Sequence, residues 1–110
     1  MKVSLELPSF KVIDLSTAHI TKEDNEILLA TVGAVAEAHP QVVLQHGFGY
    51  FVSTWHNGKD NPENFEEALL KLGHSPSYVN LVMLAHRAGA KWLCLDCDAE
   101  AIDGLPVYSW

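Results

Sequence analysis

Arginine is almost missing from this sequence. Arg87 is the only one in 110 residues, and seven Lys and Arg stand against fourteen Asp and Glu, for a formal net charge of −7. Binding to a phosphate backbone needs clustered basic side chains that displace counterions, and Arg supplies the two-pronged contact to phosphate and guanine. We therefore expect no direct nucleic-acid binding. An acidic surface favours a partner protein with a basic surface.

Cysteine and long apolar segments are also scarce. Only Cys94 and Cys97 occur, so a disulfide framework cannot form. Glu6 and Pro8 interrupt the N-terminal region, which lacks the apolar core of a signal peptide. No run approaches the roughly 18–20 apolar residues of a membrane span. We expect a protein of the reducing cytoplasm, without a membrane partner.

The sequence does contain ample material for a hydrophobic core. Hydrophobic residues make up 48% of it, and no linker, repeat or low-complexity tract divides the chain, so one domain over residues 1–110 is expected. Thr21 with Asp24, and Ser75 before Pro76, are typical helix starts. Periodicity then predicts strands at Phe10–Leu15, Val42–His46, Tyr50–Trp55, Lys91–Asp96 and Leu105–Tyr108, and helices at Lys22–Ala38, Pro62–Gly73 and Pro76–Ala88.

This order, β-α-β-β-α-α-β-β, predicts an α+β fold. We expect a mostly antiparallel sheet of four to five strands, covered on one face by about three helices. Gly47-Phe48-Gly49 suits a tight hairpin turn between the second and third strands, and His56–Asn61 is expected to be a loop.

The Cys94-Leu95-Asp96-Cys97 segment has the spacing of zinc and thiol redox motifs. Structural zinc needs four ligands, and no second such pair or paired histidine follows. A redox cysteine is favoured at a helix N-terminus, whereas these two lie on or beside a predicted strand. We predict ordinary buried or half-buried thiols and no metal or cofactor, with a metal or redox role as the alternative.

Acidic residues are densest just after that segment, at Asp96, Asp98, Glu100 and Asp103. No Lys, Arg or His occurs from Trp92 onward to balance them. A calcium-binding EF-hand loop is excluded, because Ala101 replaces its turn glycine and Val107 its closing glutamate. An acidic turn that meets solvent or a partner is the favoured interpretation.

Histidine and serine offer no recognisable catalytic motif. The six histidines show no HxH, HxxxH or HExxH spacing, although His46 and His56 could meet across the hairpin. His86 shares a helix face with Val79, Val82 and Met83, which is typical of a histidine at the edge of a core. Ser75 lacks a nucleophile elbow and is explained as a helix cap. We predict no catalytic residue.

Aromatic residues crowd the hairpin at Phe48, Tyr50, Phe51 and Trp55. Most should lie in the core. In a sheet with one open face, however, alternation turns half of the hairpin side chains outward, and exposed aromatic rings are favoured interface anchors. An aromatic patch bordered by acids would suit protein docking.

Four segments resemble a small uncharacterised domain family carried by phages, plasmids and other mobile elements. They are Ser16–Asp24, Gly49–Val52, the helix from Ser75 to Gly89, and Ala90–Asp96 running into Asp103–Trp110. The family has no assigned function, so the resemblance implies no catalytic residue. It implies a mobile-element protein that acts in the cytoplasm of a bacterial host.

The leading hypothesis is a non-enzymatic accessory protein that binds and modulates a host protein. An anti-restriction or anti-CRISPR inhibitor would present carboxylates where phosphates normally bind. The expected partner-binding residues are Asp96, Asp98, Glu100 and Asp103, with a second patch of Asp60, Glu63, Glu66 and Glu67.

Two alternatives stay open. One is a small metal-binding or hydrolytic enzyme centred on Cys94–Asp98 with a histidine brought close by folding. The other is a structural or regulatory homodimer that pairs through an exposed strand edge or an aromatic patch.

Overall fold

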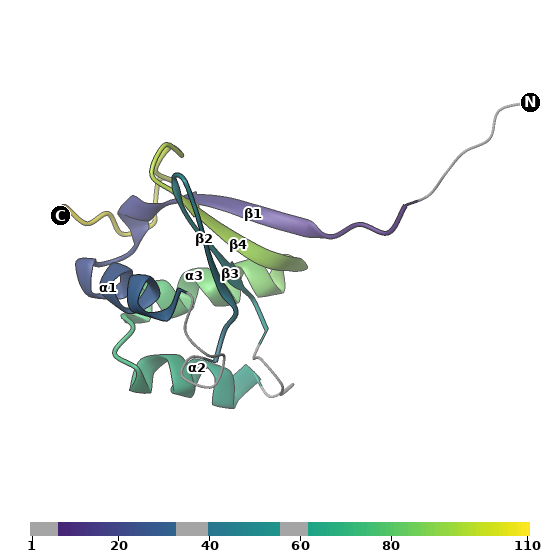
Figure 1. Ribbon diagram of the computed structural model, residues 1–110, viewed down its shortest axis with the longest axis horizontal. Coiled ribbons are helices and arrows are strands. Elements are labelled where there is room, and N and C mark those ends of the chain that lie inside the picture. The colour runs from purple at the N-terminus through teal and green to yellow at the C-terminus, as the bar shows by residue number, and fades with distance from the viewer. Residues whose placement is uncertain (1–6, 33–39, 56–61) are drawn as a thin grey trace, which may run out of the picture.

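The structure is a computed structural model that describes residues 7–32, 40–55 and 62–110 (Figure 1). Side chains are described from Phe65 onward in the last range. The elements in chain order are β1 (Lys11–Ser16), the 3₁₀ helix η1 (Thr17–His19), α1 (Lys22–Thr31), β2 (Val43–His46), β3 (Gly49–Ser53), α2 (Pro62–Lys71), α3 (Pro76–Arg87) and β4 (Ala90–Asp96).

The four strands form one sheet in the order β1-β4-β3-β2. β2 pairs with β3 and β3 with β4 in antiparallel fashion, whereas β1 runs parallel to β4 with Ile13 opposite Leu93. The predicted α+β fold is confirmed, with four strands and three α-helices in the described residues, but the sheet is mixed. The parallel edge pair is the part that sequence reasoning missed.

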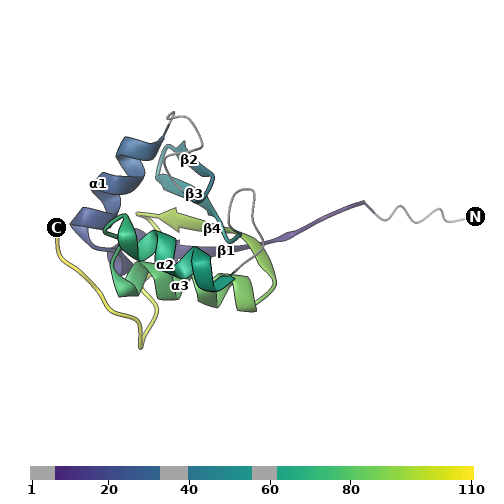
Figure 2. The same cartoon turned by 90° about the horizontal axis from the view of Figure 1, so that it is seen from below.

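All three α-helices lie on the same side of the sheet (Figure 1). Seen from below, α2 and α3 lie in front of β1 and β4, with α1 beside them (Figure 2). The core fills the space between, where Leu93 and Leu95 of β4 and Val52 of β3 are fully buried. The helices bury Leu28, Leu69, Tyr78, Leu81 and Val82 against these strands.

Helix starts agree with the sequence prediction. Thr21 caps α1 in a capping box with Asp24, and Ser75 caps α3 with Pro76 in its first turn. After α2, Gly73 adopts φ +100°, a left-handed conformation that favours glycine. The predicted Lys22–Ala38 helix is confirmed as far as Thr31; residues 33–38, like the predicted loop 56–61, lie outside the described residues.

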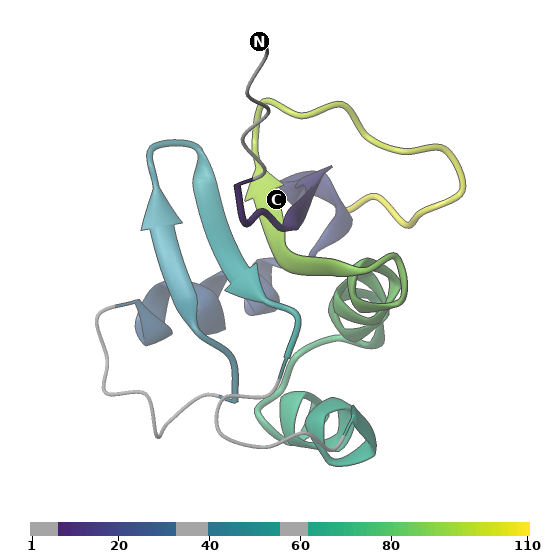
Figure 3. The same cartoon turned by 90° about the vertical axis from the view of Figure 1, so that its right-hand side faces the viewer.

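The predicted strand Leu105–Tyr108 is wrong. Residues 97–110 form no strand or helix and lie on the side of β4 away from the β2–β3 hairpin (Figure 3). Pro106 has no N–H for a strand ladder. The backbone instead makes one bond from Tyr108 N to Ala18 O (2.8 Å), and the Trp110 indole donates to Ile20 O (2.9 Å).

His19, a buried residue of η1, fastens this C-terminal segment. Its Nδ1 donates to Pro106 O (2.7 Å), and its Nε2 accepts from Ile102 N (2.9 Å). A carbonyl can only accept and a backbone N–H can only donate, so both contacts define one neutral tautomer. The segment that carries Glu100 and Asp103 is therefore held by a histidine at the far end of the sequence.

Candidate protein-binding surface

The sheet has one face that none of the described helices covers (Figure 1). Strand alternation and the pairing registers place one set of side chains there, and we name it the open sheet face. Besides the buried Ser16 and Ser53, its members are Val12, Asp14, Leu44, His46, Phe51, Trp92, Cys94 and Asp96. Leu44 is 50% exposed and Val12 41%, whereas Leu93 and Leu95, which point to the helices, are fully buried.

Aromatic rings occupy much of this face and its rim. Trp92 meets Trp55 edge to face at 5.1 Å, and the Phe51 ring lies 4.9 Å from the His46 ring. Phe48, at the hairpin turn, is 58% exposed. Tyr50 points the opposite way into the core, where its hydroxyl donates to Asn25 of α1 (2.9 Å). Tyr50 alone of the four hairpin aromatics is buried, so the expectation that most of them lie in the core is wrong, whereas alternation does turn Tyr50 and Phe51 to opposite faces as expected.

A row of polar side chains crosses the same face. The Cys94 Sγ lies 3.4 Å from His46 Nε2, and the carboxylate of Asp14 accepts a hydrogen bond from the thiol. Phe48 N donates to His46 Nδ1 (3.1 Å), so the proton of neutral His46 is on Nε2 and points at sulfur. Among the described residues, His46 is thus the histidine that folding brings to Cys94.

This row is arranged to keep the thiol neutral. Burial, the hydrogen bond to Asp14 and the negative charges of Asp14 and Asp96 raise the pKa of Cys94 to about 12. A nucleophilic cysteine requires a lowered pKa. A metal-bound imidazole usually donates from its second nitrogen, whereas His46 accepts there. The geometry therefore supports neither a thiolate nucleophile nor a metal at His46.

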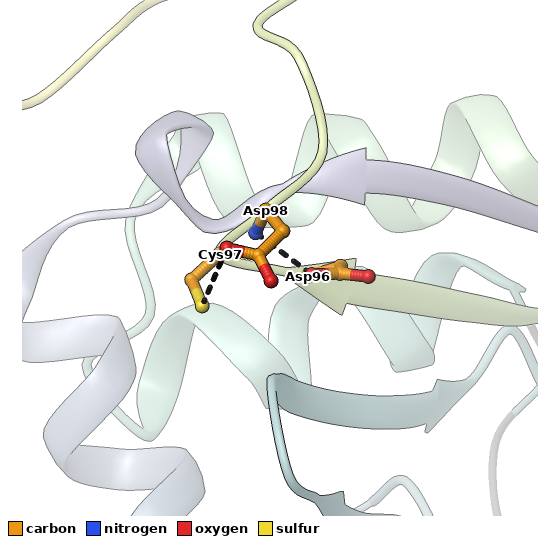
Figure 4. A group of neighbouring side chains, drawn as sticks. All are labelled: Asp96, Cys97 and Asp98. Carbon is orange, nitrogen blue, oxygen red and sulfur yellow. Dashed lines mark hydrogen bonds between the residues drawn. The ribbon is translucent and has the colours of Figure 1, made fainter.

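The acidic turn follows directly on β4 (Figure 4). Ligand atoms of Asp96, Cys97 and Asp98 lie within 4.8 Å of one another. Asp98 N donates to Asp96 Oδ1 (2.8 Å), and Cys97 Sγ–H contacts Asp98 Oδ1 at 3.9 Å. Cys97 N also donates to Phe48 O (2.8 Å), which ties the turn to the hairpin tip. The turn presents two carboxylates and a thiol beside the open sheet face.

The other predicted acids are more scattered. Glu100 and Asp103 are exposed on the C-terminal segment. Asp60 and the Glu63 side chain lie outside the described residues. Glu66 is half-buried on α2, and Glu67 is exposed and pairs with Lys71 at 3.8 Å. Since α2 lies below the sheet, Glu66 and Glu67 do not extend the surface that Asp96 and Asp98 begin (Figure 1).

The two cysteines differ in exposure. Cys94 is buried, as predicted, whereas Cys97 is exposed, so the expectation of a second buried or half-buried thiol is wrong. Cys97 follows the end of β4 and lies in the turn, where alternation no longer decides which way a side chain points. His86 is also exposed, contrary to the prediction of a core-edge position.

Sequence reasoning missed a buried cluster that resembles a catalytic triad in composition. Asp24 Oδ1 accepts from His74 Nδ1 (2.9 Å) and Ser75 N (2.8 Å), and its Oδ2 accepts from the Ser75 hydroxyl (2.6 Å) and Thr21 N (3.0 Å). The His74 ring stacks on Tyr78 at 4.0 Å. Ser75 bonds to the aspartate rather than to the histidine, and Asp24 is fully buried.

The role of this cluster is to join two helix starts. Although burial opposes ionisation, the hydrogen bonds from His74, Ser75 and Thr21 outweigh it and hold the pKa of Asp24 well below its usual range. The charged carboxylate caps both α1 and α3. The signals in the sequence were the two caps at Thr21 and Ser75, but neither signal shows that they meet.

These features define a small mixed α+β domain with a helix-covered face and an aromatic, acid-bordered open face. Residues 12–110 match the C-terminal domain of DUF5983, a family of unknown function, and the chain belongs to that family. No curated protein and no solved structure matches the chain. Within the described residues, no helix is both long and apolar enough to cross a membrane.

Proposed function

We propose that this domain is a non-enzymatic binding protein that docks its open sheet face onto a basic surface of another protein. The observation that supports this most is the coincidence of half-buried aromatic and exposed aliphatic side chains with uncompensated carboxylates on the open sheet face. Aromatic anchors provide binding energy, and charges of one sign steer the partner and fix its orientation.

The carboxylates on and beside this face have no cationic partner among the described residues. In the described part of the chain, the contacts between basic and acidic side chains are Lys71–Glu67 on α2 and the buried hydrogen-bonded pair His74–Asp24. Asp14, Asp96 and Asp98 take part in neither. The negative charges of Asp14 and Asp96 act on the face itself, where they contribute to the raised pKa of Cys94. A Lys or Arg side chain of a partner would relieve this repulsion.

The open sheet face alone is smaller than the area that a stable protein interface buries on each partner. Strands of six, four, five and seven residues, at about 3.3 Å per residue and about 4.8 Å between strands, give roughly 350 Å² of flat area. Stable interfaces bury about 800 Å² per partner. The hairpin tip with Phe48 and the acidic turn with Asp98 adjoin the face and would supply the remainder.

The particular partner we propose is a host nuclease or defence complex with a basic nucleic-acid channel. The domain would then be an anti-restriction or anti-CRISPR inhibitor of a phage or other mobile element, acting in the bacterial cytoplasm. Its negative charge of −7 and the clustering of carboxylates beside an apolar face support this proposal. Carboxylates there would compete with the phosphates of the nucleic acid.

The test compares two charge-matched variants in affinity purification from a bacterial host. Asp14→Asn with Asp96→Asn neutralises the open sheet face, and Glu66→Gln with Glu67→Gln makes the same charge change on α2. We expect the first variant to lose the co-purifying protein and the salt dependence of binding, and the second to keep both. Equal binding by the two variants would overturn the proposal.

A second candidate function is binding of a divalent cation at the acidic turn. It is favoured by the three ligand atoms of Asp96, Cys97 and Asp98 within 4.8 Å. Elemental analysis of the purified protein, with Cys97→Ser and Asp98→Asn beside it, tests this directly. Stoichiometric metal that disappears in both variants would support the metal site, and its absence would reject it.

Homodimer formation is the third candidate. Of the strands described, β1 and β2 are the sheet edges, and such edges can pair with a second copy. Light scattering over a range of protein concentrations distinguishes a dimer from a monomer.

A further inference from the structure

A pocket of about 440 Å³ opens near the start of β4, at the end of that strand away from the acidic turn. This volume lies within the range of small-molecule sites. Its lining consists of Thr54, Trp55, His86, Gly89, Ala90 and Lys91. The residues come from the end of β3, the end of α3 and the start of β4, and none of them is acidic.

The walls of the pocket are fixed by their own contacts. The Thr54 hydroxyl donates to Ala90 O (2.6 Å), and Thr54 N donates to Lys91 O (3.1 Å). The Trp55 ring is held edge to face against Trp92 at 5.1 Å. A planar apolar wall is therefore in place before any ligand arrives, which lowers the entropic cost of binding.

Positive charge gathers around this pocket. Three of the five Lys and Arg residues in the described ranges are Lys11, Arg87 and Lys91, and all three lie at this end of the molecule. The reason is topological. β1 and β4 run parallel, so Lys11 pairs with Ala90 at one end and Ser16 with Asp96 at the other. The strand pair is basic where it begins and acidic where it ends.

Helix capping accounts for only part of this gathering. Lys11 Nζ donates to Ala88 O (3.2 Å), where the carbonyl end of α3 attracts a cation. Lys91 and His86 line the pocket, are exposed, and form no ion pair with any described residue. Lys91 thus leaves a cationic group, and His86 an imidazole ring, beside a flat aromatic wall.

We propose that this pocket binds a small organic anion with a planar ring, whose ring packs on Trp55 and whose carboxylate or phosphate meets Lys91 and His86. A polyanion is a poor fit. The acidic turn lies about seven residues along β4, roughly 20 Å away, and would repel an extended chain of phosphates. The site is separate from the acidic turn, so the proposal does not depend on the partner-binding function.

Titrations followed by amide NMR spectra test the proposal. The anionic probes are indole-3-acetate and adenosine 5′-monophosphate. Indole and adenosine are the matching fragments that keep the ring but lack the charge, and inorganic phosphate keeps the charge but lacks the ring. We expect at least one anionic probe to shift the signals of Trp55 and Lys91 with a Kd below about 1 mM, and each of its fragments to bind at least tenfold more weakly.

Substitutions in the pocket test separately the contacts to the negative group of the probe and the contact to its ring. Lys91→Gln should weaken the binding of that probe about tenfold, and His86→Ala several-fold, because the first removes a charge and the second a hydrogen-bonding ring that meet the anion. Trp55→Leu should remove the preference for a ring. Lys71→Gln changes an exposed lysine on α2 and should have no effect. The proposal fails if neither anionic probe binds at about 10 mM, or if Lys91→Gln and Lys71→Gln bind equally.

Discussion

Two clusters in this molecule use similar residue types on opposite sides of one sheet. On the helix side, Asp24 and His74 are fully enclosed, and the carboxylate accepts bonds from two helix starts. On the open side, Asp14 and His46 flank Cys94, and Asp14 is exposed. The inner cluster connects parts of the fold. The outer one connects nothing beyond neighbouring strands and the hairpin turn.

The difference shows how composition alone misleads. Asp, His and Ser together suggest catalysis, yet the cluster that contains them is structural because its serine and aspartate serve as caps. The outer row has only a neutral thiol, but its carboxylates remain available to a partner. Four changes would sharpen or break this contrast.

The largest effect is expected for Asp24→Ala. It removes at once the carboxylate that accepts from His74, Ser75 and Thr21, and so breaks a buried hydrogen-bonded pair together with the links to two helix starts. Breaking a buried pair in this way costs about 3–5 kcal/mol. Urea denaturation followed by circular dichroism measures the loss. Thr21→Ala, which removes one cap of the same cluster, should cost only about 1 kcal/mol. If Asp24→Ala costs no more than Thr21→Ala, the cluster does not join the two helices.

His19→Ala should have the next largest effect. It leaves Pro106 O and Ile102 N without partners and should destabilise the protein by about 2 kcal/mol. Hydrogen exchange at Ile102 and Tyr108 should rise more than tenfold. Val107→Ala, at a residue 61% exposed on the same segment, is the control and should leave exchange unchanged. Unchanged exchange in His19→Ala would mean that the segment is held by other contacts.

Acid should destabilise the protein through Asp24. Its pKa is lower in the folded state than in the unfolded chain, where it is about 3.9. The folded state therefore gains stability above pH 4 and loses it as the pH falls toward the lowered value, with a slope of at most about 1.4 kcal/mol per pH unit from this group. In Asp24→Asn the slope between about pH 4 and pH 2 should be smaller. Identical slopes would show that other carboxyl groups control acid unfolding.

The smallest change in stability is expected on the open sheet face. Asp14→Asn should alter the free energy of unfolding by less than about 0.5 kcal/mol, because Asp14 is exposed. It should lower the pKa of Cys94 from about 12, because one negative charge and one acceptor are removed. Alkylation rates against pH, in a Cys97→Ser background, measure this. A rate profile identical to that of the parent would show that Asp14 does not act on the thiol.

Local patterns predicted the elements well. The caps at Thr21 and Ser75 placed two helix starts, and apolar alternation placed β2, β3 and β4 within a few residues. The turn at Gly47-Phe48-Gly49 was also predicted, and Gly49 allows a close approach, because a Cβ there would come within 1.8 Å of Leu95 O. These signals work because each depends on residues close together in the sequence.

Contacts between residues far apart in the sequence were not predictable in this way. The alternation of side chains in β1 does not indicate that this strand pairs with β4 in parallel. The positions of the histidines in the sequence do not indicate that His46 contacts Cys94 or that His74 contacts Asp24. The last predicted strand failed because the segment lies beside η1 rather than beside a strand: Tyr108 forms a single backbone bond to Ala18 there, and His19 holds the segment. In each case tertiary contacts decide what a local pattern leaves open.

The parallel pair β1–β4 also has a consequence for the order in which the protein folds. Lys11 pairs with Ala90, so β1, the first strand in the sequence, can pair only after β4, the last strand, has been synthesised. Contacts of such high sequence separation slow folding, because a long loop must close before they form. During synthesis the β2–β3 hairpin can form on its own, but its neighbour β4 and the edge strand β1 join only after α3 has emerged. We expect slow folding for a chain of this size, and a period of synthesis during which the apolar side chains of β1 are exposed to chaperones or to premature pairing.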